Sequence, residues 1–181
     1  MVKSKNPMRR LMLLRHAKTE RPETGQRDRD RKLTERGRAD APVIGAYMAR
    51  HDLVPDRVLV SPAARSEETW ALLAAALSAA PRVSSDERIY AASPEQLVSV
   101  IREAGESRTL LLVGHNPGLH ELAVRLIASG DGEARERLAE KLPTSGLVVI
   151  DLPVADWSRL KGKAGRLERF VSPRLIAAAT D

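Results

Sequence analysis

The sequence predicts an α/β fold of three layers, an αβα sandwich in which a mostly parallel central sheet is flanked by helices. Short apolar runs alternate with longer helical stretches along the 181 residues, which favours strands joined by crossover helices. Hydrophobic residues make up 43% and charged residues 30% of the chain, which is typical of a folded globular protein. There is no repeat or linker. We therefore expect a single domain over residues 1–181, with a flexible basic leader over residues 1–9.

The first elements are expected around a long polar loop. Leu11–Leu14 is continuously apolar and predicts a buried strand, after which polar residues continue to about Lys32. A helix is expected from Thr34, whose hydroxyl can cap the first turn, to about His51. Pro42 predicts a kink in this helix or a later start.

The remaining elements continue the alternation. Helices are expected after two of the strands. One is opened by Ser61-Pro62 and reaches about Leu77, and the other runs from about Leu119 to Ser129. Ser93-Pro94 opens a helix between them. A charged helix is expected near Glu133 to Lys141. The further expected strands are Val58–Val60, Leu110–Val113, Leu147–Leu152 and Leu167–Val171.

The composition excludes several classes of protein. The chain has no cysteine, so it has no disulfide framework and no thiol nucleophile. No apolar run approaches the ~20 residues that cross a bilayer, and the basic start does not have the pattern of a signal peptide. We expect a cytoplasmic protein without a membrane partner.

The net charge of +6 is concentrated at one end of the chain. Residues 1–40 contain 13 Lys and Arg against 6 Asp and Glu. The five aromatic residues are dispersed, so no platform for stacking bases is visible and nucleic acid is not expected as the main partner. The charge indicates anionic chemistry near the N-terminus, and the Arg-rich loop from Arg21 to Lys32 is expected to be a solvated rim that favours anionic substrates.

Three loops with chemically capable residues follow the apolar strands. Arg15-His16 follows the first of these strands, Ser61 to Arg65 follows the second, and Gly114-His115-Asn116 follows the third. In open α/β sheets, ligands bind at the carboxyl ends of the strands. Each motif alone also has a structural interpretation. For example, Gly114 to Gly118 can be an ordinary tight turn.

No metal site is expected. His115, His120 and Glu121 are close in sequence, but the spacing of the two histidines does not place them on one helical face. Phosphate-binding glycine motifs and the Gly-x-Ser-x-Gly elbow are absent.

Taken together, the motifs resemble the histidine phosphatase (phosphoglycerate-mutase-like) superfamily, and most closely its SixA-type phosphohistidine phosphatases. Ala17 stands where the superfamily usually has glycine, a difference of one methyl group. The motifs that carry the resemblance are Leu14–Lys18, Leu33–Gly37, Ser61–Thr69 and Val113–Gly118.

The resemblance implies that His16 is the nucleophile and that Arg15, Arg65 and His115 bind the phosphoryl group, with no cofactor. Two neighbouring guanidinium groups would keep the imidazole of His16 neutral. Lys18 and Asn116 are expected to bind substrate. Glu87 is the expected acid for the leaving group, although it can also be a solvated charge.

The resemblance implies a metal-independent phosphatase that hydrolyses phosphohistidine on proteins through a covalent phosphohistidine intermediate. Imidazole leaves more readily than an alkoxide, so this substrate needs weaker protonation. One alternative is a small-molecule phosphomonoesterase with the same site and a small phosphorylated metabolite as substrate. The other is a non-catalytic domain that binds a phosphorylated ligand. The oligomeric state is left open.

Overall fold

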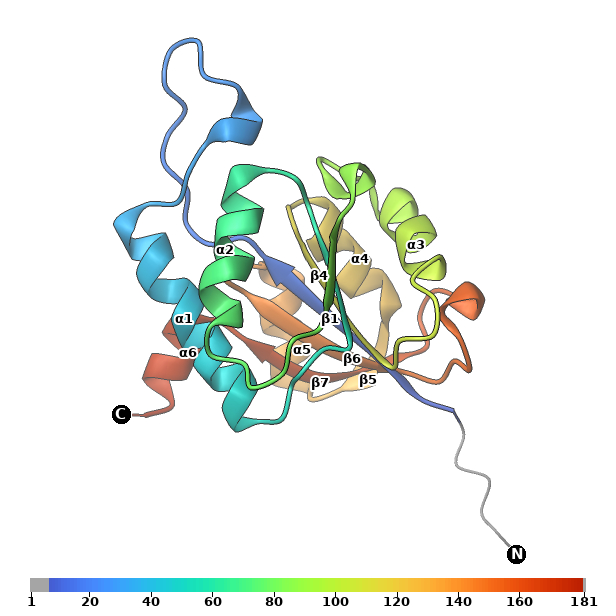
Figure 1. Cartoon of the computed structure of the whole chain (residues 1–181). Coiled ribbons are helices and arrows are strands. Elements are labelled where there is room, and N and C mark those ends of the chain that lie inside the picture. Colours follow the sequence, from blue (N-terminus) through green and yellow to red (C-terminus); the bar gives the residue numbers. More distant parts are fainter. Residues whose placement is uncertain (1–6, 181) are drawn as a thin grey trace, which may run out of the picture.

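The computed structural model describes residues 7–180, which form one sheet of seven strands in the order β3-β2-β4-β1-β6-β7-β5 (Figure 1). Strand β6 runs antiparallel to β1 and β7, and the other neighbouring pairs are parallel. The strands are β1 (Arg9–Arg15), β2 (Arg57–Val60), β3 (Arg82–Ser85), β4 (Thr109–Gly114), β5 (Ile127–Gly130), β6 (Leu147–Leu152) and β7 (Gly165–Val171).

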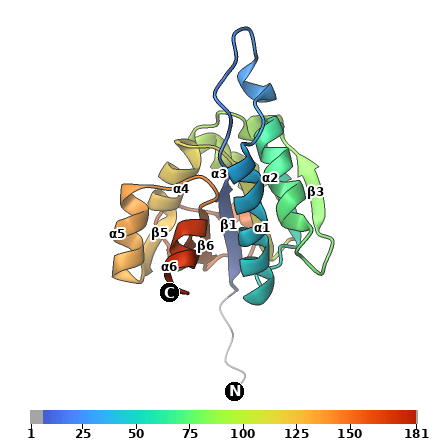
Figure 2. The ribbon, with the colours of Figure 1, turned by 90° about the vertical axis from the view of Figure 1, so that its left-hand side faces the viewer.

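Helices cover both faces of this sheet (Figures 1 and 2). Side chains of the first group, α1 (Glu35–Arg50), α2 (Ala64–Ala74) and α6 (Pro173–Ala178), contribute to one apolar cluster. Those of the second group, α3 (Pro94–Arg102), α4 (Gly118–Leu126) and α5 (Gly132–Glu140), contribute to another. The predicted αβα architecture is confirmed. Short 3-10 helices span Asp28–Asp30, Glu87–Ile89 and Trp157–Arg159.

Strand β1 shows how the sequence builds two cores from one run of apolar residues. Side chains alternate between the faces of a strand, so Met12 and Leu14 join the cluster with α1 and α2, whereas Leu11 and Leu13 join the cluster with α3 and α4. All four side chains are fully buried. A strand covered on both faces has no polar positions, which explains the uninterrupted run.

The predicted helix starts are confirmed at two of the polar caps. Thr34 accepts a hydrogen bond from the Gly37 N–H at 3.0 Å, and Ser93 forms a capping box with Gln96 at the start of α3. Helix α1 begins at Glu35 and includes Pro42, so the expected later start was wrong. The Thr34 cap and the buried apolar face of α1 outweigh the hydrogen bond that proline cannot donate.

Other boundaries differ from the prediction. Helix α2 begins at Ala64, not at Ser61, because the Ser61 hydroxyl is hydrogen bonded to His115 instead of to the helix. The helix predicted to reach Ser129 ends at Leu126, and the next four residues form β5. Pairing with β7 overrides the local helical preference there.

Most of the expected leader lies outside the described residues, which begin at Pro7. Arg9, the last residue of the expected leader, is already the first residue of β1. Its guanidinium donates to the carbonyl oxygens of Ala155 and Ser107. None of the helices in residues 7–180 is long and apolar enough to span a membrane.

Gly37→Ala is expected to destabilise the protein by about 2 kcal/mol. A methyl group at this position would lie 2.2 Å from the Lys18 carbonyl oxygen. This overlap outweighs the ~1 kcal/mol that alanine gains over glycine in a helix. Gly132→Ala is the matched control, because nothing lies within 4 Å of the added methyl group. Urea denaturation measures both variants, and equal midpoints would contradict the assignment of this close approach.

Candidate functional site

The three predicted loops meet at one edge of the sheet. Arg15 lies opposite Gly114, and Val60 opposite Val113, in the parallel ladders β1 with β4 and β2 with β4. The carboxyl ends of these strands therefore reach the same level. A cavity of about 270 Å³ opens there, lined by Arg15, His16, Lys18, Thr19, Arg31, Arg65, His115, Asn116 and Thr144.

His16 directly follows β1 and is only 8% exposed. Its Nδ1 lies 2.8 Å from the Ala17 carbonyl oxygen. Only a protonated nitrogen can donate to a carbonyl, so we assign the hydrogen to Nδ1 and the free lone pair to Nε2. Burial, together with the charges of Arg65 and Arg15, lowers the pKa of His16 to about 4. The ring is therefore neutral at pH 7 and carries a nucleophilic nitrogen.

His115 is the second buried imidazole, with its ring centroid 5.2 Å from that of His16. Its Nε2 is 2.6 Å from the Ser61 hydroxyl, which itself accepts from the Ala63 N–H. Within residues 7–180, His115 Nδ1 is buried without a hydrogen-bond partner. Burial is the main cause that lowers the pKa of His115 to about 3, and the positive charge of a protonated His16 is the next cause. In the free protein His115 is a neutral ring.

The two predicted arginines are held differently. Arg15 donates to the carbonyl oxygen of Leu142 at 3.1 Å, and its Nε is buried without a partner in the described part of the chain. Burial lowers the pKa of Arg15. Arg65 is 6% exposed, and both its terminal nitrogens donate to Asp28, one to the carbonyl oxygen at 2.8 Å and one to the carboxylate at 2.9 Å. Asn116 lines the cavity and donates to Leu142 at 2.9 Å.

Asp28 is the main residue that the sequence reasoning missed. It also accepts hydrogen bonds from the Tyr90 hydroxyl and from Arg31. These bonds hold the pKa of its carboxyl well below the usual range. Asp28 lies in the middle of a long polar loop, so no strand end or spacing marks it. Ser61 stands directly after an apolar strand, where the sequence predicts that it opens a helix.

The loop of residues 20–32, at the top of Figures 1 and 2, is largely exposed, as expected of a solvated rim, but several of its arginines form ion pairs. Arg27 pairs with Asp30, Arg31 with Asp28, and Arg29 with Glu87. Arg29 also lies 5.0 Å from the centre of the Tyr90 ring. Much of the positive charge in this loop is thus neutralised locally, and the loop is tied to the segment around residues 87–90.

The structure does not bring Glu87 into the cavity. Its side chain is 74% exposed, and Arg29 contacts its carboxylate at 2.8 Å. Lys18, by contrast, lines the cavity with an exposed side chain. Its carbonyl oxygen is fixed by the N–H of Thr34 at 2.9 Å.

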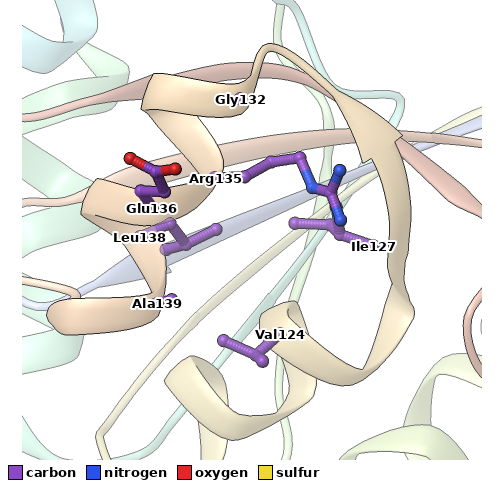
Figure 3. A pocket seen from close by; sticks show the side chains of 7 residues that line it. All are labelled: Val124, Ile127, Gly132, Arg135, Glu136, Leu138 and Ala139. Atoms are coloured by element: carbon purple, nitrogen blue, oxygen red, sulfur yellow. The ribbon is translucent and has the colours of Figure 1, made fainter.

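A larger hollow of about 370 Å³ lies between α4, β5 and α5, away from these residues (Figure 3). Its walls are mainly aliphatic, and the charged side chains among its lining residues are Arg135 and Glu136. It holds no histidine and no activated nucleophile. Within residues 7–180, no group of three His, Asp or Glu side chains is arranged to hold a metal ion.

The chain is similar in sequence and in fold to known proteins. Residues 11–90 match the Histidine phosphatase superfamily (branch 1). An uncharacterized protein of Mycobacterium tuberculosis is 35% identical over 164 residues, which are 89% of this chain and 100% of the relative. A SixA crystal structure from Agrobacterium tumefaciens is 32% identical with a TM-score of 0.78, covering 92% of this chain and 99% of that one. The chain belongs to the histidine phosphatase superfamily and is of the SixA type.

A second SixA structure, of a protein histidine phosphatase in complex with tungstate, has the same fold as this histidine phosphatase. It is 19% identical, with a TM-score of 0.73, and the match covers 92% of this chain and 99% of that chain.

The structure explains how this histidine phosphatase accommodates Ala17 in place of the usual glycine. The Ala17 side chain is fully buried in a small apolar cluster with Leu33 and Ala41. Its N–H donates to the Thr69 hydroxyl at 3.0 Å, and that hydroxyl donates to the Arg65 carbonyl oxygen. Thr69 thus links the loop after β1 to the turn that carries Arg65, and the extra methyl group faces away from the cavity.

Lowering the pH from about 7 to 4.5 is expected to lower the free energy of unfolding. His16 and His115 have depressed pKa values in the folded state, whereas unfolded histidines bind a proton near pH 6.5. The unfolded state gains protons first, so stability falls between about pH 6.5 and 4, by at most about 1.4 kcal/mol per pH unit for each histidine. Urea titrations at several pH values measure the loss.

The double variant His16→Ala/His115→Ala should show a shallower pH dependence. His51 is the matched control, since it lies at the exposed end of α1 with its ring near Tyr47. His51→Ala should keep most of the loss. Equal slopes in the wild type and in the double variant would contradict the assignment.

Proposed function

We propose that this histidine phosphatase hydrolyses phosphohistidine on proteins through a phosphohistidine intermediate on His16, without a metal ion. In the first step His16 Nε2 bonds to phosphorus, the substrate's P–N bond breaks, and the released imidazole takes up a proton from solvent. In the second step water attacks the phosphorus and gives up a proton to solvent, the P–Nε2 bond breaks, and phosphate leaves. The observation that carries this proposal is a buried, neutral His16 with a free ring nitrogen among arginines.

The surrounding cations can stabilise the charge that phosphoryl transfer spreads over the equatorial oxygens. Arg15 and Arg65 are permanently charged planar forks that match these oxygens. His115 also lines the cavity, and an incoming dianion raises its pKa toward protonation, which makes its ring a further donor. Lys18 and Asn116 are proposed to contact the substrate, since both line the cavity.

Asp28 occupies the donors of Arg65 in the empty site. A phosphoryl group carries more negative charge than a carboxylate and offers more oxygens, so it can take over these donors. The displaced Asp28 still has Arg31 and Tyr90 as partners. Binding is therefore an exchange of anions at Arg65, and the cavity accepts only ligands that compete with a carboxylate.

The leaving group is the reason for preferring phosphohistidine over an alkyl phosphate. Asp28 is held ionised by its partners, and Glu87 is solvent exposed beside Arg29, so neither presents a proton to the cavity in this conformation. Phosphohistidine needs only weak protonation of its leaving imidazole. The open cavity also suits a side chain on a protein surface. We place this reaction in the cytoplasm and assign it to one domain over residues 1–181.

Turnover of a phosphohistidine protein should form an acid-labile phosphoryl label on His16. The label should be absent in His16→Ala and present in His51→Ala, which changes a histidine outside the cavity. Rapid quenching with ³²P-labelled substrate measures it. A cavity that binds the substrate without becoming labelled would support the non-catalytic alternative.

A substrate panel separates the two enzymatic alternatives. The kcat/KM for the phosphohistidine protein should exceed that for sugar, nucleotide and other small phosphate esters, and EDTA should not change it. A preference for one metabolite by orders of magnitude would establish the small-molecule phosphomonoesterase instead.

Glu87→Gln tests the proposed leaving-group acid. We expect kcat for phosphohistidine to change less than about twofold, because imidazole needs little assistance. If Glu87 leaves Arg29 to protonate poorer leaving groups, kcat for an alkyl phosphate should fall by about 100-fold. An unchanged kcat for both substrates would remove Glu87 from the mechanism.

A further inference from the structure

A second hollow adjoins the phosphoryl cavity. It has a volume of about 190 Å³ and lies between the first turns of α1 and the start of α6. Lys18 and Thr144 line both hollows, so the two adjoin at these residues. Other residues that line the second hollow are Arg36, Asp40, Pro143 and Arg174.

The two flanks of the phosphoryl cavity differ in charge. On the side of residues 27–31, the arginines are paired with carboxylates at 2.8 to 2.9 Å. On the side of the second hollow, Lys18 and Arg174 have no ion pair with any of residues 7–180. Arg36 has a single long contact of 3.7 Å with Asp40. The cations on this flank are therefore available to a ligand that extends beyond the phosphoryl cavity.

The mixed lining favours an acidic polypeptide segment over a compact second phosphate. Asp40 lies among these cations and is 3.7 Å from Arg36, so singly charged groups spread along a chain suit this lining better than a compact dianion. An Asp or Glu side chain can reach one cation at a time. The rings of Pro143 and Pro173 offer apolar surface to the backbone and neighbouring side chains of such a segment.

We propose that Lys18, Arg36 and Arg174 form a subsite for acidic side chains that flank the phosphorylated residue of a protein substrate. This subsite rests on the proposed function, because it requires a substrate whose polypeptide extends on either side of the phosphorylated residue. It makes the substrate a protein whose phosphorylated residue lies in an acidic surface segment.

The test uses two fluorescein-labelled peptides, each with one phosphohistidine. In one peptide aspartates flank the phosphohistidine, and in the other asparagines replace them. Binding is measured by fluorescence anisotropy with His16→Ala as host, which prevents turnover, and kcat and KM are measured with the otherwise unchanged protein. At low ionic strength we expect the aspartate peptide to bind about fivefold more tightly, with the difference lost at high salt.

Arg36→Ala/Arg174→Ala should abolish this preference and raise KM for the aspartate peptide about fivefold with kcat unchanged. Arg50→Ala is the matched control, an exposed arginine at the other end of α1. Asp40→Asn should change affinity in the opposite direction and strengthen binding of the aspartate peptide. A gain of affinity cannot be produced by partial unfolding.

The outcomes separate the subsite from the catalytic proposal. Equal affinity for both peptides, or a preference that survives Arg36→Ala/Arg174→Ala, would overturn the subsite whatever the turnover. Preferential binding of the aspartate peptide without its hydrolysis by the unchanged protein would support the subsite and overturn the proposed reaction. Hydrolysis of both peptides with equal KM would leave the proposed reaction standing and remove the subsite.

Discussion

The alignment of β2, β4 and β1 is the constraint on which the site depends. Because these neighbouring strands are parallel and in register, their carboxyl ends reach one edge together. The chain then turns at the same level after each strand, and the N–H groups of His16 and Ser61 donate to carbonyl oxygens of β4. A shift of one strand by a single residue would exchange the side chains that enter its two apolar clusters and would separate the two histidines. The apolar segments of these strands therefore fix the geometry of the candidate site as well as the core.

Burial makes the electrostatics of this edge effective. Water stabilises the charged form of a histidine on the surface, whereas here burial and cations disfavour the imidazolium forms of both rings. The same enclosure strengthens the attraction between arginine and an entering anion. Asp28 limits this attraction, because its carboxylate already partly neutralises Arg65. Asp28 thus compensates the buried charge of Arg65, while Arg15 keeps the site cationic for the phosphoryl group that we propose.

The sequence predicted those parts of the molecule that are encoded locally. Apolar strands covered on both faces stand out as uninterrupted runs, and Arg15, His16 and His115 could be located because they adjoin such runs. Strand β3 could not, since all four of its residues are exposed and only pairing with β2 defines it. Asp28 could not either, because its contacts to Arg65 and Tyr90 span 37 and 62 residues. The sequence contains no periodic signal for contacts at that separation.

The net charge of +6 shows why composition alone is a poor guide to the partner. Much of the excess lies in the first 40 residues, yet folding divides those residues into three groups with different consequences. Arginines of the loop over residues 27–31 form ion pairs with neighbouring carboxylates. Arg15 is half-buried in the wall of the cavity, where we propose that its charge acts at short range on a phosphoryl group. Lys18 and Arg36 stay exposed beside Arg174, far along the sequence, so their charge can act on a ligand that extends beyond the cavity. In our proposals Arg15 acts on the phosphoryl group, whereas Lys18 and Arg36 act on its surroundings, although all three belong to the same basic segment.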